Sequence, residues 1–231
     1  MTPNPTNTKA RVLEVARRLF HEQGYHATGI STILREADVN SGSLYHYFPS
    51  KEALLVGVLQ YYIDLLVPVV MAPAEAGATD PIERVFVLLN NYRRGLEMFE
   101  HKMGCPIGNL ALEVGDDFAD ARKLIDQNFR NWAAHIEGWL RPIADRFPPG
   151  TDLSKIGHFI LTVMEGAVMQ ARAAASLAPY DDSVAHLRAY LTLLLSDPTR
   201  PPAPSTTLDG AGPTVAPSPG RPRHAEEGGS C

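Results

Sequence analysis

The chain has 231 residues, of which 45% are hydrophobic and 20% are charged, and its net charge is −5. These values are typical of a globular protein with room for more than one hydrophobic core. The acidic balance argues against a protein that coats nucleic acid with its whole surface. The first 60 residues, however, contain six basic and five acidic residues, so if any part of the chain contacts a polyanion, it is this end.

Signals for export or membrane insertion are not expected in this sequence. The opening segment, MTPNPTNTKARV, lacks the apolar centre of a secretion signal, and we expect no apolar run of about 18 residues that would span a bilayer. The cysteines are Cys105 and Cys231, and the second lies in a tail rich in proline, so a structural disulfide is not expected. These features predict a cytoplasmic protein without membrane association.

The first 40 residues have the apolar spacing of two amphipathic helices. The stripe of the first helix consists of Val12, Ala16, Leu19 and Phe20. Gly24 follows this stripe, and glycine commonly ends a helix. The stripe of the second helix consists of Ile30, Ile33, Leu34 and Ala37, and Thr28 is its expected N-cap.

A short polar turn leads to a third helix, expected from Ser41 to about Tyr47. Asn40 is its expected N-cap. Pro49 ends it, because the residue before a proline is disfavoured in the helical region. Ser50 is then the expected cap of a fourth helix, with Glu52 in the first turn, where the helix dipole favours a carboxylate.

The remaining pattern changes to longer helices and then to a tail. The fourth helix is expected to end near Val67, before Pro68, and four longer helical stretches are expected at 81–103, 118–143, 153–177 and 184–195. No segment alternates apolar and polar residues, so the sequence predicts an all-α protein. Residues 197–231 contain eight prolines and five glycines, a composition typical of a disordered tail.

The second and third helices, with the turn between them, span Gly29 to Phe48 and form a helix-turn-helix pattern. In this motif the N-terminal residues of the second helix meet base edges in the major groove, while neighbouring groups hold phosphates. The residues of the expected reading helix are small or aromatic: Ser41, Gly42, Ser43, Tyr45, His46 and Tyr47. Taken alone, the three rings would also fit a local core. Lys51 adds a charge that can contact a phosphate.

Residues 25–55 closely resemble the DNA-binding domain of the TetR family of bacterial transcriptional regulators, and the resemblance extends over residues 8–60. It rests on the order of Leu44, Tyr45, Tyr47, Phe48, Ser50, Lys51 and Glu52. The resemblance implies phosphate contacts by Thr28, Tyr45 and Lys51. It implies a groove-facing set of Ser41, Ser43, His46 and Tyr47, and it places Leu44 and Phe48 in the core.

Two positions depart from the family pattern. Asp38 occupies the turn where the family often has glycine, and aspartate tolerates left-handed geometry. Asn40 replaces the usual serine or threonine cap and is an equally good one. The departures therefore leave the expected helix-turn-helix intact.

The resemblance implies a helix-turn-helix DNA-binding domain at 8–54 and a larger helical domain for ligand binding and dimerisation at 55–196, followed by the tail at 197–231. Small residues in the last two helices, Ala167, Ala171, Ala174 and Ala175, suit close packing between two chains, and a two-fold dimer reads a pseudo-palindrome. The function expected is a ligand-responsive repressor, a homodimer released from a double-stranded DNA operator by a small molecule. An activator, or an all-α small-molecule binding protein that has lost DNA binding, would fit the same residues.

Apolar and aromatic residues of the larger domain indicate a pocket for a small apolar or electrophilic effector. The candidate ligand-binding residues are Phe99, Met103, Cys105, Asn109, Phe129, Trp132 and Met164. The segment around Cys105 resembles that of a TetR-family branch in which some members respond to electrophiles or oxidants through a cysteine. At a helix N-terminus the Cys105 thiolate would be stabilised by the dipole. The alternative interpretations are plain core packing and an inert, buried cysteine.

Enzyme signatures are weak. The chain has no glycine-rich phosphate loop and no Gly-x-Ser-x-Gly sequence. The pairs His135 with Glu137 and His158 with Glu165 lack metal-ligand spacing. We therefore expect no catalytic residues, no metal and no cofactor.

Overall fold

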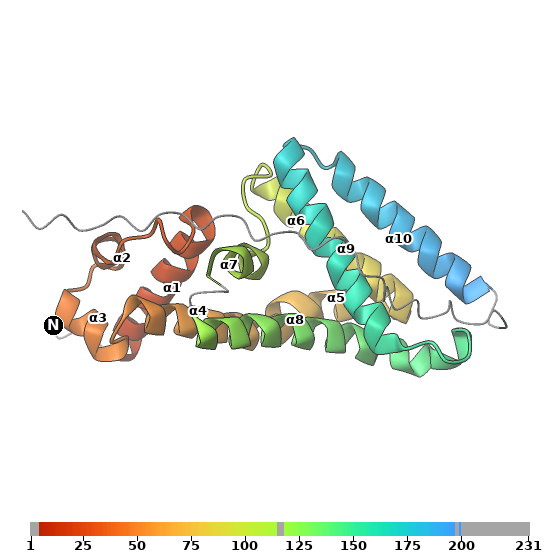
Figure 1. Ribbon diagram of the computed structural model, residues 1–231, viewed down its shortest axis with the longest axis horizontal. Coiled ribbons are helices and arrows are strands. Elements are labelled where there is room, and N and C mark those ends of the chain that lie inside the picture. Colours follow the sequence, from red (N-terminus) through yellow and green to blue (C-terminus); the bar gives the residue numbers. More distant parts are fainter. Residues whose placement is uncertain (1–4, 115–117, 197–198, 200–231) are drawn as a thin grey trace, which may run out of the picture.

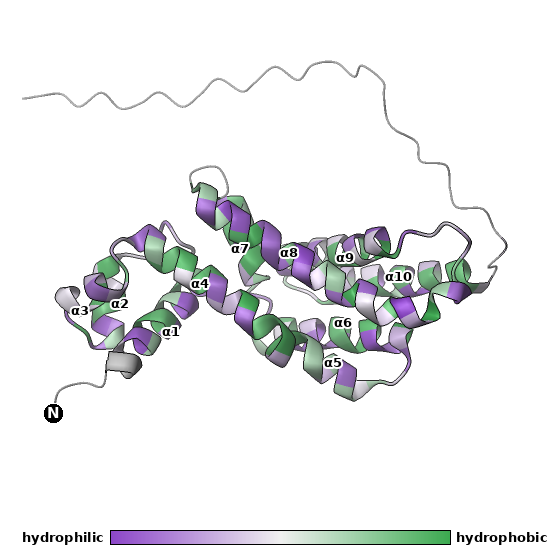
Figure 2. Cartoon of the chain, turned by 90° about the horizontal axis from the view of Figure 1, so that it is seen from below, coloured by the Kyte–Doolittle hydropathy of each residue, from purple (hydrophilic) through white to green (hydrophobic). Residues whose placement is uncertain are grey.

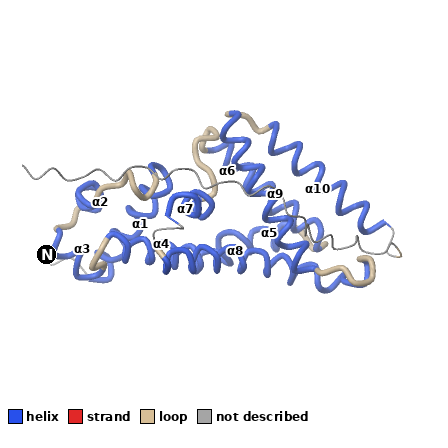
Figure 3. Tube along the Cα trace, in the orientation of Figure 1, coloured by secondary structure: helices blue, strands red, loops and turns tan. Residues whose placement is uncertain are grey.

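The computed structural model describes residues 5–114, 118–196 and 199. Every regular element in this part of the chain is helical (Figure 3), which confirms the all-α prediction. The elements are α1 (Pro5–Gln23), α2 (Ile30–Ala37), α3 (Ser41–Tyr47), α4 (Lys51–Leu65), a π-helical turn (Leu66–Met71), α5 (Ala72–Gly77), α6 (Pro81–Met98), α7 (Pro106–Val114), α8 (Ala119–Leu140), a 3-10 turn (Arg141–Arg146), α9 (Leu153–Ala174) and α10 (Ala178–Ser196). The predicted tail, with Cys231, lies outside the described residues apart from Thr199.

The molecule is elongated, with α1–α3 at one end and α6, α9 and α10 toward the other (Figure 1). The long helices α4 and α8 run side by side between the two ends. Helix α7 lies across the middle, beside α1 and α8. Viewed from below, apolar residues gather on the inner faces of these helices (Figure 2).

The described residues form two hydrophobic cores. The first joins α1–α3 to α4, α7 and the start of α8, and its largest members are Leu19, Phe20, Tyr25, Ile33, Leu44, Phe48, Leu54, Leu55, Leu59, Ile107, Leu110 and Ile125. The second is built from α5, α6, the rest of α8, α9 and α10. Because the first core continues through Leu54 and Leu55, the domain boundary between these residues stays a prediction, and packing does not break there.

The local signals around the third helix are confirmed. Gly24 has φ of +88°, a left-handed conformation that suits glycine after a helix. Asp38 also adopts this conformation, with φ 50° and ψ 54°. The Oδ1 of Asn40 accepts the backbone N–H of Ser43 at 2.8 Å, and Ser50 Oγ caps α4 in the same manner.

Several predicted helix ends are wrong. Gly29, and not Thr28, is the N-cap of α2. Pro68 does not stop the fourth helix, because a π-helical turn carries the chain past it into α5. The helix that begins at Pro81 ends at Met98, because the chain turns through Glu100 and His101 at φ of 50° and 62°.

The stretch from Lys51 to Gly77 is long and apolar enough to cross a membrane by length and composition, contrary to the prediction that no such stretch exists. Core helices of soluble proteins meet the same criterion. Its first half packs against α1 and α8, and Leu54, Leu55, Val58 and Leu59 are fully buried there. Apolar residues of the π-helical turn, such as Val67 and Val69, are exposed.

Candidate DNA-binding surface and effector cavity

The side chains of helix α3 divide between a buried face and an accessible face. Leu44 and Phe48 are 0% and 5% exposed and belong to the first core, as predicted. Tyr45 is 48% exposed and His46 is also exposed. Tyr47 is half-buried, with its ring 4.9 Å from that of His46 in an edge-on arrangement. The outer face of α3 is therefore aromatic and accessible.

The small residues at the start of α3 are also accessible. Ser41 and Gly42 are exposed, and Ser43 is half-buried with its backbone N–H bound to the Asn40 cap. Since no large side chain covers this end, another surface can approach the backbone of the helix closely.

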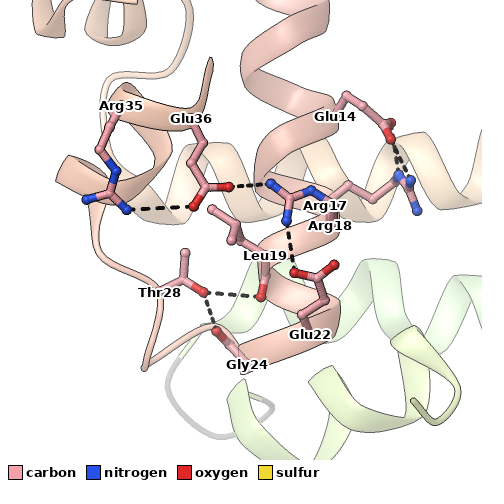
Figure 4. Close-up of polar contacts among 9 residues, drawn as sticks. All are labelled: Glu14, Arg17, Arg18, Leu19, Glu22, Gly24, Thr28, Arg35 and Glu36. Carbon is pink, nitrogen blue, oxygen red and sulfur yellow. Dashed lines mark hydrogen bonds and ion pairs between the residues drawn. The ribbon is translucent and has the colours of Figure 1, made fainter. Parts of the chain in front are cut away.

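Polar contacts fix α1 against α2 and the turn that leads to α3. The guanidinium of Arg18 on α1 pairs with Glu22 on the same helix at 2.9 Å and with Glu36 on α2 (Figure 4). Arg11 donates to the backbone carbonyl of Asp38 at 3.0 Å. These contacts hold the turn whose geometry sets the direction of α3.

The side chain of Thr28 faces inward, which overturns the predicted phosphate contact. Thr28 is 0% exposed, and its hydroxyl donates to the carbonyl of Gly24 at 2.7 Å and lies 3.3 Å from that of Leu19 (Figure 4). A hydroxyl used inside the fold is not accessible to DNA. Thr28 therefore fixes the α1–α2 turn, and the exposed residues at the start of α2 are Gly29 and Ser31.

Lys51 is held at the start of α4 by an aromatic ring. Its Nζ lies 4.3 Å from the ring centroid of Tyr25, which is buried, a cation–π arrangement. Partial burial lowers the pKa of the ammonium, and the charge of Glu113 acts in the opposite direction. The positive charge is thus fixed in position near the end of α3.

Two cavities lie on either side of Cys105 in the larger domain. One has a volume of about 220 Å³ and is lined by residues of α1, the π-helical turn, α6 and the 99–106 segment. The other has a volume of about 500 Å³ and lies between α7, α8 and α9. Gly104, Cys105 and Val168 line both. The mainly apolar lining suits a small organic molecule.

The cavities bring together part of the predicted ligand set. Phe99 and Met103 line the smaller cavity, Asn109 and Phe129 line the larger, and Cys105 lines both. Trp132 and Met164 line neither cavity. Both belong to the second core, and the Trp132 indole donates to the Tyr92 hydroxyl at 3.1 Å. Their positions agree with the alternative of plain core packing, and their ligand contacts stay a prediction.

The sequence interpretation missed several residues of the cavity walls. Tyr92 and His21 line the smaller cavity, while His158, Glu165 and Arg172 line the larger. A signal for Glu165 was present in the sequence. It lies at helical spacing between Leu161 and Val168, so that an acid interrupts an apolar stripe.

The environment of Cys105 agrees with the alternative of a buried, inert cysteine and not with a stabilised thiolate. Burial raises the pKa of its thiol well above the usual value, and the nearby Glu165 carboxyl raises it further. The backbone N–H groups of Ile107 and Gly108 at the start of α7 lower it, but by less. The helix N-terminus is present, yet desolvation outweighs it.

Helix α7 connects the cavities with the helix-turn-helix. Its carboxyl end carries Glu113, whose carboxylate accepts the backbone N–H groups of Tyr25 and His26 at 2.8 and 2.6 Å. Before its amino end, the carbonyl of Gly104 accepts a hydrogen bond from His21 Nε2 on α1 at 2.7 Å. The cavity wall thus has two polar attachments to the DNA-binding end.

Two protein-family descriptions match this chain. The family described as "Bacterial regulatory proteins, tetR family" matches residues 12–58, and "Tetracyclin repressor-like, C-terminal domain" matches residues 81–187. An uncharacterized HTH-type transcriptional regulator of Mycobacterium tuberculosis is 30% identical over 197 residues, covering 83% of this chain and 98% of the relative. The chain belongs to the TetR family of bacterial regulatory proteins.

Two further TetR-family relatives align along most of their length. The HTH-type transcriptional repressor NemR of Escherichia coli is 27% identical over 188 residues, covering 79% of this chain and 92% of the relative. The crystal structure of NemR in its reduced form has a TM-score of 0.69 at 25% identity, covering 84% of this chain and all of that one. A TetR regulator from Chloroflexus aurantiacus has a TM-score of 0.71 at 29% identity, covering 81% and 96%.

As a TetR-family protein, the chain is a DNA-binding transcriptional regulator, a class of soluble, dimerising proteins that are not enzymes. Within the described residues, no group of three or more His, Cys, Asp and Glu side chains is arranged to hold a metal. The described residues thus combine an accessible helix, α3, at one end of the molecule with a mainly apolar cavity that α7 connects to that end.

Proposed function

We propose that the chain is a cytoplasmic, homodimeric repressor that leaves a pseudo-palindromic operator when a small molecule occupies the cavities beside Cys105. The observation that carries the proposal is the double attachment of the cavity wall to the helix-turn-helix, through His21 with Gly104 and through Glu113 with the α1–α2 turn. NemR, a named repressor, is similar over most of its length, which favours repression over activation.

The proposed DNA surface is the outer face of α3 with the start of α4. Tyr45, His46 and Tyr47 would meet the groove and its edges, and the small residues Ser41, Gly42 and Ser43 would allow close approach. The fixed ammonium of Lys51 would contact a phosphate. Thr28 has a supporting role in this proposal, since its side chain is buried.

The proposed dimer surface is an apolar face on α9 and α10. Phe159 and Tyr190 are 43% and 41% exposed, and their rings meet edge-on at 5.3 Å. Leu193 on the same helix as Tyr190 is also exposed. The small residues Ala167 and Ala171, expected at a dimer contact, are instead buried within this chain. The exposed rings therefore replace them as the proposed contact between two copies, which would set the spacing of two α3 helices for two half-sites.

The proposed switch depends on a difference in effector affinity between two conformations. An effector shifts the balance only by as much as it prefers one state, typically about 1–3 kcal/mol. Cys105, Gly108 and Asn109 at the amino end of α7 line the larger cavity, and Glu113 at the other end holds the α1–α2 turn. A displacement of α7 by the effector would therefore move the turn that positions α1 and α3.

The proposal is tested by binding of the full chain to the DNA upstream of its own gene. A gel-shift titration against unrelated competitor DNA should show preferential binding, and Tyr47→Ala should reduce that preference. Glu97→Ala, which changes an exposed side chain far from α3, serves as the control. Equal binding to both DNAs, unchanged by Tyr47→Ala, would refute the DNA surface. A reporter measured after gene deletion should rise, whereas a fall would indicate an activator.

A further inference from the structure

The larger cavity contains one acidic side chain in an otherwise mainly apolar wall. Glu165 projects from α9 at helical spacing between Leu161 and Val168, which line the same cavity. Its carboxylate is also pressed against α7, where a side chain larger than hydrogen at Gly108 would collide with Oε2. Glycine at this position therefore allows the carboxylate to lie at the junction of α7 and α9.

The carboxylate of Glu165 is incompletely satisfied. Its Oε1 is buried and has no hydrogen-bond partner among the described residues, and none of the ion pairs found in this part of the chain includes Glu165. The Cys105 thiol is its hydrogen-bonding neighbour, and burial raises the pKa of the carboxyl group. A buried acceptor without a partner is unfavourable, and more so when it is charged, so its presence in a cavity wall favours a partner supplied from outside.

The other polar groups of the cavity do not supply that partner. Arg172 is exposed, and its guanidinium lies 3.3 Å from Asn109 Oδ1. His158 is exposed, and its Nδ1 lies 2.9 Å from the backbone carbonyl of Ser154. Both lie toward solvent, whereas Glu165 is at the buried side of the cavity. The wall thus combines apolar surface with a buried carboxylate oxygen that has no partner among the described residues.

We propose that the larger cavity binds an aromatic or aliphatic molecule carrying a protonated amine, whose ammonium group donates to Glu165. The apolar body of such a molecule would lie against Phe129, Leu161 and Val168. A volume of about 500 Å³ is in the range of small-ligand pockets. This inference rests on the proposed effector function, for which it names the chemical class.

The position of Glu165 also indicates how such a ligand would act. Glu165 touches α7 at Gly108, and α7 holds the α1–α2 turn through Glu113 five residues further on. An ammonium group bound at Glu165 changes the contact between α9 and α7 at its amino end. The ammonium group would therefore bind at the α9–α7 contact, and α7 connects that contact to the helix-turn-helix.

The test uses three probes that share one ring system but differ in charge: 1-naphthylmethylammonium, 1-naphthalenemethanol and 1-naphthoate. Calorimetric titration of the full-length protein at pH 7 should give the ammonium probe about 10–100 times the affinity of the alcohol, as expected for a charge-assisted hydrogen bond to a buried group. The carboxylate probe should bind more weakly than the alcohol. Glu165→Gln should abolish most of the ammonium preference. Glu97→Gln, the same change at an exposed carboxylate that lines neither cavity, is the matched control and should keep it.

Several results of these titrations would overturn the proposal. Equal affinity for ammonium and alcohol in the unaltered protein overturns the proposal without any variant, as does preference for the carboxylate or binding of none of the three. Persistence of the ammonium preference in Glu165→Gln also overturns it. Anisotropy titration with operator DNA separates the two proposals: Glu165-dependent binding that leaves DNA affinity unchanged supports the site and refutes its effector role.

Discussion

The link between α7 and the helix-turn-helix predicts a large effect from a single change, Glu113→Ala. The Glu113 carboxylate accepts two backbone N–H groups, those of Tyr25 at 2.8 Å and His26 at 2.6 Å. It also lies against Gly24, where a Cβ would come within 2.9 Å of Oε2. Glu113→Ala removes both of these side-chain hydrogen bonds between α7 and the α1–α2 turn at once.

The expected loss in the free energy of unfolding depends on whether each N–H group finds a new hydrogen-bond partner in the variant. Hydrogen bonds to a charged group contribute roughly 1.5–3 kcal/mol each. His26 is exposed, so its N–H can turn to water, whereas Tyr25 is 4% exposed and its N–H is left without a partner. We expect a loss of about 2–3 kcal/mol in the free energy of unfolding. For a protein of this size that corresponds to a fall in Tm of about 4–12 °C.

The assay is thermal unfolding of purified protein, followed by circular dichroism, with two matched variants. Glu113→Gln keeps one acceptor oxygen and should lose about half as much stability. Glu97→Ala removes an exposed carboxylate that pairs with Arg93 at 3.6 Å, and such pairs contribute less than about 1 kcal/mol. A Tm for Glu113→Ala within about 1 °C of that for Glu97→Ala would refute the reasoning. Faster amide exchange at residues 24–28 in Glu113→Ala alone would locate the loss at the turn.

Three other changes test separate parts of the structure. Lys51→Ala should weaken binding to operator and unrelated DNA alike and lower the salt slope by about one, measured by anisotropy at several salt concentrations; a loss confined to operator DNA would contradict a phosphate contact. Alkylation of Cys105 should be slow at pH 7 and accelerate with rising pH, because burial raises the pKa of the thiol; mass spectrometry with Cys105→Ser as control measures it, and a rate independent of pH would count against this environment. Glu165→Gln should raise Tm more at pH 8 than at pH 5. The folded state holds the carboxyl proton more tightly than the unfolded chain does. The contribution of the Glu165 carboxyl to stability therefore falls as pH rises from the unfolded pKa of about 4.3 through the folded pKa. A Tm that Glu165→Gln lowers more at pH 8 than at pH 5 would contradict this sign.

Local sequence signals predicted the helix-turn-helix because they act over a few residues. The Asn40 cap, the left-handed Asp38 and the Ser50 cap all depend on neighbours within four positions. The spacing of Leu44 and Phe48 was enough to separate core from surface on α3. In such cases a helix face follows from periodicity alone.

The sequence left alternatives open, or misled, where one chemical property permits two structures. Thr28 has the hydroxyl of an N-cap, but that hydroxyl bonds inward to Gly24. Trp132 and Met164 have the spacing of pocket residues and also of core residues, and tertiary packing decides between them. The thiol of Cys105 combines a helix N-terminus with burial, and only the fold reveals which dominates.

The contacts that connect the two ends of the molecule could not be predicted from the sequence for a different reason. Glu113 and the turn at Tyr25 and His26 are almost 90 positions apart, and neither has an unusual local pattern. From sequence alone, a glutamate on an amphipathic helix is expected to face solvent, because its partner cannot be identified. Once α7 lies across α1, the same carboxylate becomes the acceptor for two main-chain N–H groups, and the left-handed Gly24 allows it to approach them. In the proposed switch, the coupling between effector and DNA therefore requires no dedicated motif. One short helix, α7, lines the cavity at its amino end and holds the α1–α2 turn at its carboxyl end.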